Sequence, residues 1–208
     1  SKEGFSMRKL ICLLALAMAV ALGAGCAATL PTNSYTPQNF VRTTGKVDMG
    51  TFTYVAFVEG KKVKKPNQIQ NTAAGQIYIS TDVADFVKRG NALELEKSGV
   101  MLDPSAPIRL DANILEFKAD DLGYSVDWSY KIQYMIVNKS DSQLLFDKTF
   151  SPSPKKGGKF GNPSDYANVV SETILGGYDL FIRDPDAKRI LEEAALPQPS
   201  AQSSNVKK

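Results

Sequence analysis

The stretch Tyr124 to Val137, YSVDWSYKIQYMIV, alternates between apolar and polar side chains along most of its length. One face would carry Tyr124, Val126, Trp128, Tyr130, Ile132, Tyr134 and Ile136, and the other Ser125, Asp127, Ser129, Lys131 and Gln133. Successive side chains of a β-strand point to opposite sides of a sheet, so the pattern predicts a long strand with one buried and one wet face. Such a strand is typical of an antiparallel sheet.

The neighbouring segments predict further strands of the same sheet. Residues 108–114 alternate in the same way, and a turn at 119–123 joins them to the long strand. A turn at 138–142 leads into a strand over 144–150. Earlier in the chain, residues 47–58 (VDMGTFTYVAFV) are rich in β-branched and aromatic residues and predict a first strand, and residues 77–79 would form a short one.

Three helices are expected around these strands. Residues 82–98 carry apolar residues at helical spacing, with Asp82 as the N-cap and Gly99 just past the end. Gly90, in the apolar stripe of this helix, suggests a close approach to the sheet. Pro163 would open a long helix to about Phe181, and Asp184-Pro185 would start a shorter one. The order β-α-β-β-β-α predicts an α+β two-layer sandwich, a mostly antiparallel sheet with two helices on one face.

The aromatic row Tyr124, Trp128, Tyr130 and Tyr134 has two interpretations. It could form the wall of a groove that binds a lipid or glycan, with Trp128 as a contact residue. The simpler interpretation is that these side chains fill the core beneath the helices. The groove requires that the helices leave this face of the sheet open.

The N-terminal region predicts export. Arg8 and Lys9 precede the apolar run Leu10 to Leu22, and small residues then lead to Cys26. This order is typical of a signal peptide over residues 7–25. The apolar run would span about 20 Å as a helix, short of the roughly 30 Å hydrocarbon core of a membrane.

Small residues that end at a cysteine resemble the lipobox of bacterial lipoproteins. The resemblance implies that Cys26 is acylated, palmitate being one expected chain, and becomes the first residue of the mature protein. Gly23 stands where the lipobox usually has Leu, so cleavage near Gly25 to release a soluble periplasmic protein is the alternative. Ala27 after the cysteine resembles the sorting signal for the outer membrane, at its periplasmic face.

The expected domain organisation follows from these segments. Residues 1–6 fit neither a signal nor a domain and are expected to be an expression remnant or a misplaced start. The polar segment 26–46 predicts a flexible tether of about 25 Å after the lipidated N-terminus, with docking of Tyr35, Phe40 and Val41 on the domain as the alternative. Residues 47–194 would form the periplasmic domain, and 195–208 a disordered tail.

Composition limits the functions that are open to the mature chain. Of 25 basic and 22 acidic residues, three and one lie in residues 1–25, which leaves 22 basic and 21 acidic. This near-neutral balance gives no reason to expect a nucleic-acid partner. The sequence has no histidine, and Cys12 would leave with the signal peptide, so no disulfide, zinc site or His-based nucleophile is expected. We therefore predict no enzyme, metal or cofactor.

Two groups of lysines are candidate contacts for an anionic head group or an acidic partner. Lys61, Lys62, Lys64 and Lys65 follow the first strand, and Lys155, Lys156 and Lys159 lie in residues 151–161, predicted to be a loop. Solvated loops are the simpler interpretation of both groups. A hydrolase with paired carboxylates could use Glu116, Asp120, Asp121 and Asp127, although acids near a turn are usually solvated.

The domain resembles the YajG-type bacterial outer-membrane lipoproteins. The likeness rests on the helix DVADFVKRGNALELEKSGV (residues 82–100), the strands IRLDANILEF (108–117) and WSYKIQYMIV (128–137), and the last helix SDYANVVSETILGGYDLFI (164–182). Related architectures occur in auxiliary lipoproteins of ABC-type lipid transporters. The resemblance implies a location and a fold, and only Cys26 carries over as a functional residue.

The sequence therefore favours one function and leaves one alternative. The first is a non-catalytic, lipid-anchored envelope protein whose periplasmic domain binds another envelope component, a protein or a lipid, as an accessory. The alternative is a lipid- or glycan-binding domain of a transport system that uses the aromatic strand face.

Overall fold

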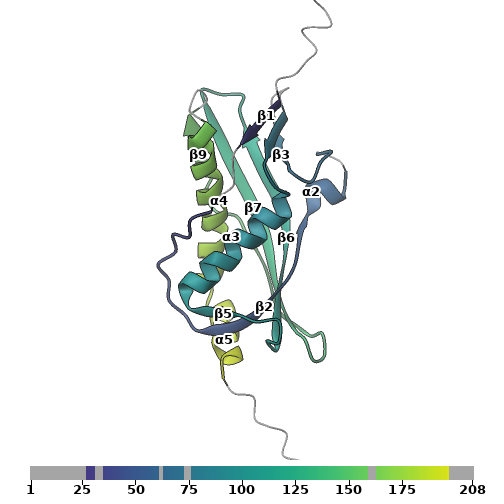
Figure 1. Ribbon diagram of the computed structural model, residues 1–208, viewed down its shortest axis with the longest axis vertical. Helices are drawn as coiled ribbons and strands as arrows, with labels where there is room; N and C mark the ends of the chain where they lie inside the picture. The colour runs from purple at the N-terminus through teal and green to yellow at the C-terminus, as the bar shows by residue number, and fades with distance from the viewer. Residues whose placement is uncertain (1–26, 31–34, 61–62, 73–75, 159–162, 197–208) are drawn as a thin grey trace, which may run out of the picture.

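The computed structural model describes residues 27–30, 35–60, 63–72, 76–158 and 163–196 (Figure 1). In chain order the elements are β1 (Ala27–Leu30), β2 (Gly45–Tyr54), α2 (Val55–Val58), β3 (Gln68–Asn71), β4 (Gln76–Ile79), α3 (Val83–Ser98), β5 (Val100–Leu102), β6 (Ile108–Asp120), β7 (Ser125–Asn138), β8 (Leu144–Phe150), β9 (Lys155–Gly158), α4 (Pro163–Arg183) and α5 (Pro185–Ala194). A sheet forms one layer and the long helices α3 and α4 form the other, which confirms the α+β sandwich.

The antiparallel pair β6–β7 is the centre of the sheet. Its register runs from Ile108 opposite Asn138 to Asp120 opposite Asp127. Each long strand is flanked by two shorter ones: β2 and β3 lie along β6, and β8 and β9 lie along β7. The pairings of β2 and β3 with β6 are parallel, a feature that the order of strands in the sequence did not predict.

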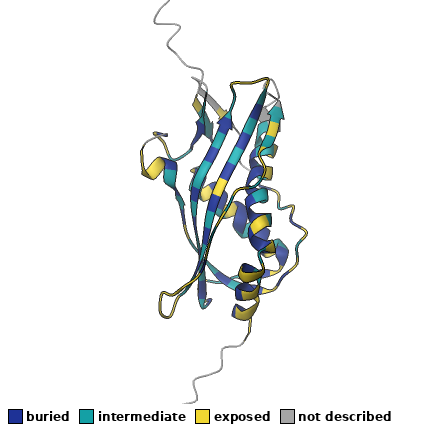
Figure 2. Ribbon diagram, turned by 180° about the vertical axis from the view of Figure 1, so that it is seen from behind, coloured by how far each residue is buried: buried dark blue, intermediate teal, exposed yellow. Residues whose placement is uncertain are grey.

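The alternation along β7 determines which face is buried. Val126, Trp128, Tyr130, Ile132, Tyr134 and Ile136 are buried, and the residues between them are half-buried or exposed. Figure 2 shows the open face, where buried and half-buried positions alternate along the central strands. Tyr124 is an exception to the prediction: it is fully exposed in the turn before β7, beyond the last pair of the β6–β7 ladder, where no second layer covers it.

Helix α3 begins and ends where the sequence predicts, although the side chain of Asp82 at the N-cap position makes no capping hydrogen bond. Gly99 has φ 104°, a left-handed conformation that glycine adopts without a Cβ clash, and its N–H donates to the carbonyls of Leu95 and Glu96. The buried face contains the predicted apolar residues Val83, Phe86 and Val87, and also Asn91, Glu94 and Ser98. Gly90 approaches Tyr35 and Ile174 rather than the sheet: an added Cβ would lie 3.2 Å from the Tyr35 ring.

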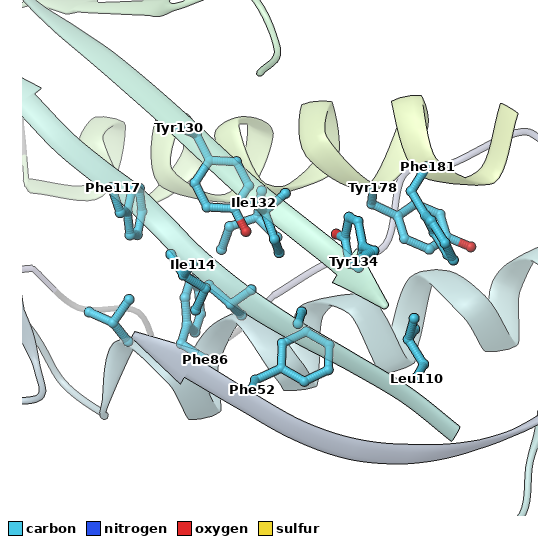
Figure 3. Packing of buried hydrophobic residues seen from close by; sticks show 14 of the residues in the cluster. Phe52, Phe86, Leu110, Ile114, Phe117, Tyr130, Ile132, Tyr134, Tyr178 and Phe181 are labelled. Atoms are coloured by element: carbon cyan, nitrogen blue, oxygen red, sulfur yellow. The ribbon is translucent and has the colours of Figure 1, made fainter. Parts of the chain in front are cut away.

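Helix α4 crosses the sheet in close contact with β7. A Cβ on Gly177 would lie 2.7 Å from the Tyr130 ring, so only glycine allows this approach. Further along the helix, the Phe181 and Tyr134 rings are 4.5 Å apart between centroids. Figure 3 shows these side chains between the central strands and the helices. Trp128, Tyr130 and Tyr134 of the aromatic row are therefore core, while Tyr124 lies outside it, and the groove interpretation is wrong because α4 covers this face.

The segment predicted to be a flexible tether is largely packed in the structure. Residues 27–30 form β1, which pairs in parallel with β4, and β2 already begins at Gly45. We call residues 35–44 the strap, because they run along α3 without regular structure. The buried residues of the strap are Tyr35, Asn39 and Thr43. Ordering the strap costs chain entropy, and its contacts with α3 offset this cost.

Two other segments differ from the prediction. The first strand ends at Tyr54, and the last four residues of the predicted stretch form the short helix α2, where Phe57 and Val58 are exposed. Residues 155–158, predicted to lie in a loop, form β9 because β7 offers an unpaired edge beside Ser125–Trp128. No helix within the described parts of the chain is long and apolar enough to cross a membrane.

Candidate functional site

A cavity of about 600 Å³ lies at one end of the molecule, between α5 and the ends of β6 and β7. Its walls come from the start of β6, the β7–β8 hairpin and α5. The lining residues are Ser105, Ala106, Pro107, Ile108, Asn138, Lys139, Ser140, Leu145, Arg189, Ile190, Glu193 and Ala194. Its volume falls within the range of sites that bind small molecules or partner side chains.

The floor of the cavity is apolar because the helix α5 turns one face toward the sheet. Ile190 and Ala194 of this face are almost fully buried, as is Ile108 at the start of β6. Behind them, Leu191 packs so close to β2 that a Cβ on Gly45 would lie 3.0 Å from its carbonyl oxygen. The glycine therefore lets α5 sit tightly on the sheet and form a fixed wall.

An N-cap and an ion pair hold the start of α5. Asp184 accepts hydrogen bonds from the backbone N–H groups of Asp186 and Ala187, as an N-cap does. The Lys148 ammonium of β8 lies 2.9 Å from carboxylate oxygens of both Asp184 and Asp186. These two carboxylates, Asp186 first, raise the pKa of Lys148, so the amine stays charged and ties β8 to the helix.

Charged groups surround the apolar floor. The Lys139 ammonium lies 2.7 Å from the Asp48 carboxylate, and Arg189 lies 2.9 Å from Glu193. Nearby, hydrogen bonds from Lys46 and Ser105 hold the pKa of Asp103 well below its usual range. Arg189 and Glu193 are both exposed, and an exposed ion pair of this kind contributes little to stability, so it can exchange for contacts with a ligand.

Exposed apolar side chains gather at the same end of the molecule. Met101 of β5, Leu144 of β8 and Leu196 after α5 are each more than half exposed, and Leu145 lines the cavity. Figure 1 shows β5 and α5 together at the lower end, away from β1. A cavity with an apolar floor, polar and charged walls and exposed apolar neighbours is a candidate binding site.

A second, smaller cavity of about 330 Å³ lies between the strap and α4. It is lined by Gln38, Asn39, Phe40, Lys155, Glu172, Leu175, Gly176, Asp179 and Arg183. Phe40 is exposed at its edge, with the Lys97 ammonium 5.6 Å from the ring centroid. Lys155 is the one predicted contact residue among the described lining of either cavity.

The structure separates the predicted basic contacts. Lys155 and Lys156 lie on β9, 3.9 Å from carboxylate oxygens of Glu172 and Asp127 respectively. Lys64 and Lys65 lie before β3, and the Lys65 ammonium is 5.2 Å from the Tyr78 ring centroid. The remaining predicted positions, Cys26, Lys61, Lys62 and Lys159, lie outside the described residues.

Trp128 is not a surface contact. Its side chain is almost fully buried among aromatic residues, with Phe117 and Tyr166 about equally close. Its indole N–H has no hydrogen-bond partner among the described residues. Trp128 therefore supports the core where β9 and α4 meet β7, and a ligand cannot reach it without displacing them.

The four carboxylates considered for hydrolysis are engaged by their neighbours. Glu116 accepts from Ser129, Asp120 and Asp121 from Thr72, and Asp127 from Ser125. The Thr72 hydroxyl and the Leu122 N–H lower the pKa of Asp120, which favours its charged form rather than a general acid. The described residues hold no group of three acids, cysteines or histidines placed to bind a metal ion.

A buried polar network beneath the strap was missed by sequence reasoning. Glu94 of α3 is fully buried and accepts hydrogen bonds from the Tyr35 hydroxyl and from the backbone N–H groups of Gln38 and Asn39. The Asn39 amide donates to Ser98, whose hydroxyl is 2.9 Å from that of Tyr178. Burial, and after it the hydrogen bond to Glu94, raises the pKa of Tyr35.

Comparisons with known proteins identify the fold. No family model matches the sequence, and the comparison with curated proteins finds no match. Among solved structures, protein XCC0632 from Xanthomonas campestris, of the family DUF330, superposes with a TM-score of 0.54 at 11% identity over 74% of this chain and 95% of its own. This likeness shows that the two chains share a fold.

Two further structures are similar to a lower degree. A protein from Chlamydia trachomatis gives a TM-score of 0.45 at 10% identity, over 70% of this chain and 98% of its own. A homolog of the neuraminyllactose-binding hemagglutinin from Helicobacter pylori gives 0.39 at 10% identity, over 77% and 97%. The class of this protein is therefore an α+β sandwich shared with the Xanthomonas protein, and the likeness to the YajG-type lipoproteins stays a prediction.

Proposed function

We propose that the chain is a lipid-anchored envelope protein whose domain binds another envelope component without catalysis, through the cavity beside α5. The anchor is the acylated Cys26, and the sequence after it favours the periplasmic face of the outer membrane. The bound component is a protein that inserts an apolar side chain into the cavity, because an apolar floor with a charged rim is the arrangement of a protein–protein hot spot.

The observation that carries the proposal is the placement of the two ends of the domain. Strand β1, directly after Cys26, lies at one end of the sheet, and the cavity with Met101, Leu144 and Leu196 lies at the opposite end. An anchored domain of this shape presents the cavity away from its membrane. A partner in the periplasm can then reach the cavity without displacing the anchor.

The non-catalytic role is supported by the chemistry of the side chains. The full sequence has no histidine, and the acids Glu116, Asp120 and Asp127 each accept hydrogen bonds from neighbouring side chains. The cavity contributes Arg189, Glu193 and Lys139 at its rim, and these groups select a partner by charge rather than form a nucleophile with its base.

The test is photo-crosslinking in cells that express the full chain. A photoreactive phenylalanine analogue replaces Leu145, which lines the cavity, and in a matched control replaces Lys131, which is exposed on the open face of β7. We expect a discrete protein adduct from position 145 and none from position 131. Absence of an adduct at 145, or equal adducts at both positions, would contradict the proposed site.

A further inference from the structure

Strand β1 fixes the end of the domain from which the anchor leaves. It runs parallel to β4, β4 runs antiparallel to β3, and β3 runs parallel to β6. Following the register across these strands, Ala27 is opposite Gln76, which is level with Gln70, and Gln70 is opposite Lys118. Ala27 therefore lies level with the last residues of β6, beside the turn that joins β6 to β7.

The chain has no slack between the anchor and the sheet. Cys26 is bonded directly to Ala27, the first residue of β1. Strand β1 contacts α4 as well as β4, and downstream the strap is fastened to α3 through Glu94. A chain held in this way cannot act as the 25 Å tether predicted from composition. An acyl anchor on Cys26 would therefore hold this end of the sheet against its membrane.

The β6–β7 turn projects from this end. Leu122 lies two residues beyond Asp120, the last residue of β6, and therefore beyond the level of Ala27, which aligns with Lys118. Its side chain is 72% exposed, and that of Tyr124 is 100% exposed. Figure 1 shows this turn at the same end of the sheet as β1.

Each lysine next to the turn lies close to a carboxylate of opposite charge. Lys118 lies 3.9 Å from Asp120, and Lys156 lies 3.9 Å from Asp127. Asp121 adds a further acid, held through its backbone N–H by the Thr72 hydroxyl. The end therefore offers an apolar and aromatic tip above mixed charges, which suits a zwitterionic head-group layer better than a strongly anionic one.

We propose that Leu122 and Tyr124 insert into the interface of the membrane that carries Cys26. Tyrosine prefers the head-group level, and an apolar side chain in a surface-bound segment reaches about 5–10 Å into the boundary of the acyl chains. The acyl anchor and the turn then hold the domain at two points, with its long axis away from the membrane. This inference rests on the acylation of Cys26 in the proposed function.

The test places a fluorophore on the turn. The mature chain has no cysteine other than Cys26, so Leu122→Cys or Tyr124→Cys provides one free thiol in the acylated protein. The matched control is Leu144→Cys, an exposed leucine at the opposite end. Each labelled protein is incorporated into vesicles of phosphatidylethanolamine and phosphatidylglycerol that contain a lipid with a nitroxide high on its acyl chain.

The inference predicts that the nitroxide quenches the two turn labels on the order of threefold more than the Leu144→Cys label, because only the turn reaches the acyl boundary. Mass spectrometry of the same samples reports whether Cys26 is acylated. If the protein is acylated and quenching is equal at both ends, the insertion of the turn is overturned while the anchor stands. Protein without acyl chains would overturn the anchor and, with it, this inference.

Discussion

Glu94 is the residue on which the N-terminal part of the domain most depends. Within the described residues its carboxylate forms no ion pair with a lysine or arginine and accepts hydrogen bonds from three donors of the strap instead. Burying a carboxylate is costly unless such donors are present. The same hydrogen bonds therefore stabilise two things: the buried charge of Glu94 and the packing of the strap on α3.

Replacement of Glu94 by alanine is expected to destabilise the domain strongly. The Tyr35 hydroxyl and the N–H groups of Gln38 and Asn39 would lose their acceptor, at about 1–3 kcal/mol for each buried group. We expect the free energy of unfolding in urea to fall by at least about 3 kcal/mol for Glu94→Ala, and by less for Glu94→Gln, which retains one acceptor oxygen.

The matched control for this prediction is Glu96→Ala. Glu96 lies two residues away on the same helix and is exposed, so its replacement is expected to change stability by less than about 0.5 kcal/mol. If Glu94→Ala unfolds at the same urea concentration as Glu96→Ala, the strap does not depend on the buried carboxylate.

The position of Glu94 could have been predicted from spacing but not from residue type. Phe86, Gly90 and Glu94 are four residues apart, so a helix that buries the first two also turns the third inward. Glutamate in a helix is mostly exposed, and the partners that make its burial possible lie more than fifty residues earlier in the chain. Local sequence holds no signal for such a distant pairing.

At the scale of elements, α5 depends on its first residues. The cap at Asp184 satisfies two backbone N–H groups and receives the Lys148 ammonium. We expect Asp184→Ala to lower the free energy of unfolding by about 1–2 kcal/mol, as for other caps. In the control Asp179→Ala, which removes an exposed ion pair with Arg183 on α4, the expected change is below about 0.5 kcal/mol.

A comparison of the two urea unfolding curves checks this prediction. Equal midpoints for Asp184→Ala and Asp179→Ala would mean that the cap is not what holds α5 against β8. Because α5 forms one wall of the cavity, the Asp184→Ala variant is also expected to give a weaker crosslink from position 145.

The elements that sequence predicted best are those with long local patterns. The alternation in β6 and β7, the period of α3 and the cap-then-proline start of α5 each specify an element without reference to the rest of the chain. Strands β1 and β9 have four residues each and exist because β4 and β7 offer them an edge. Such pairing is decided by the assembled sheet, so composition alone predicted a tether and a loop instead.

At the scale of the whole molecule, the candidate site could not be predicted. The cavity is formed by α5, the start of β6 and the β7–β8 hairpin, which are brought together only by the fold. The lysine clusters are visible in the sequence because their residues are neighbours in the chain, and they were predicted to contact a ligand or partner. Among the described residues, only Lys155 of these clusters lines a cavity. Cys26 is the one functional position that a local pattern predicts.

The buried tyrosines predict how the domain responds to alkaline pH. Burial is the largest cause that raises the pKa of Tyr35, Tyr54, Tyr130, Tyr134 and Tyr178 above the usual value of about 10. A raised pKa in the folded state means that the folded chain keeps protons that the unfolded chain would release. Stability is therefore intact below about pH 10 and declines as the pH rises above it.

We expect these phenols to ionise only as the domain unfolds. In an alkaline titration, the phenolate absorbance of the buried tyrosines should rise in one step that coincides with the loss of the circular dichroism of the folded domain. A gradual rise that is complete while the dichroism is still native would show that the aromatic layer is open to solvent, contrary to its position beneath α4.

The most direct test of the lipid-anchored binding module is native mass spectrometry of the protein extracted gently from its own membranes. We predict a chain that begins at Cys26 and carries acyl chains, together with a protein partner in fixed ratio that is lost when a bulky side chain replaces Leu145. A chain without acyl groups that begins elsewhere, or an acylated chain that never retains a partner, would contradict the proposal.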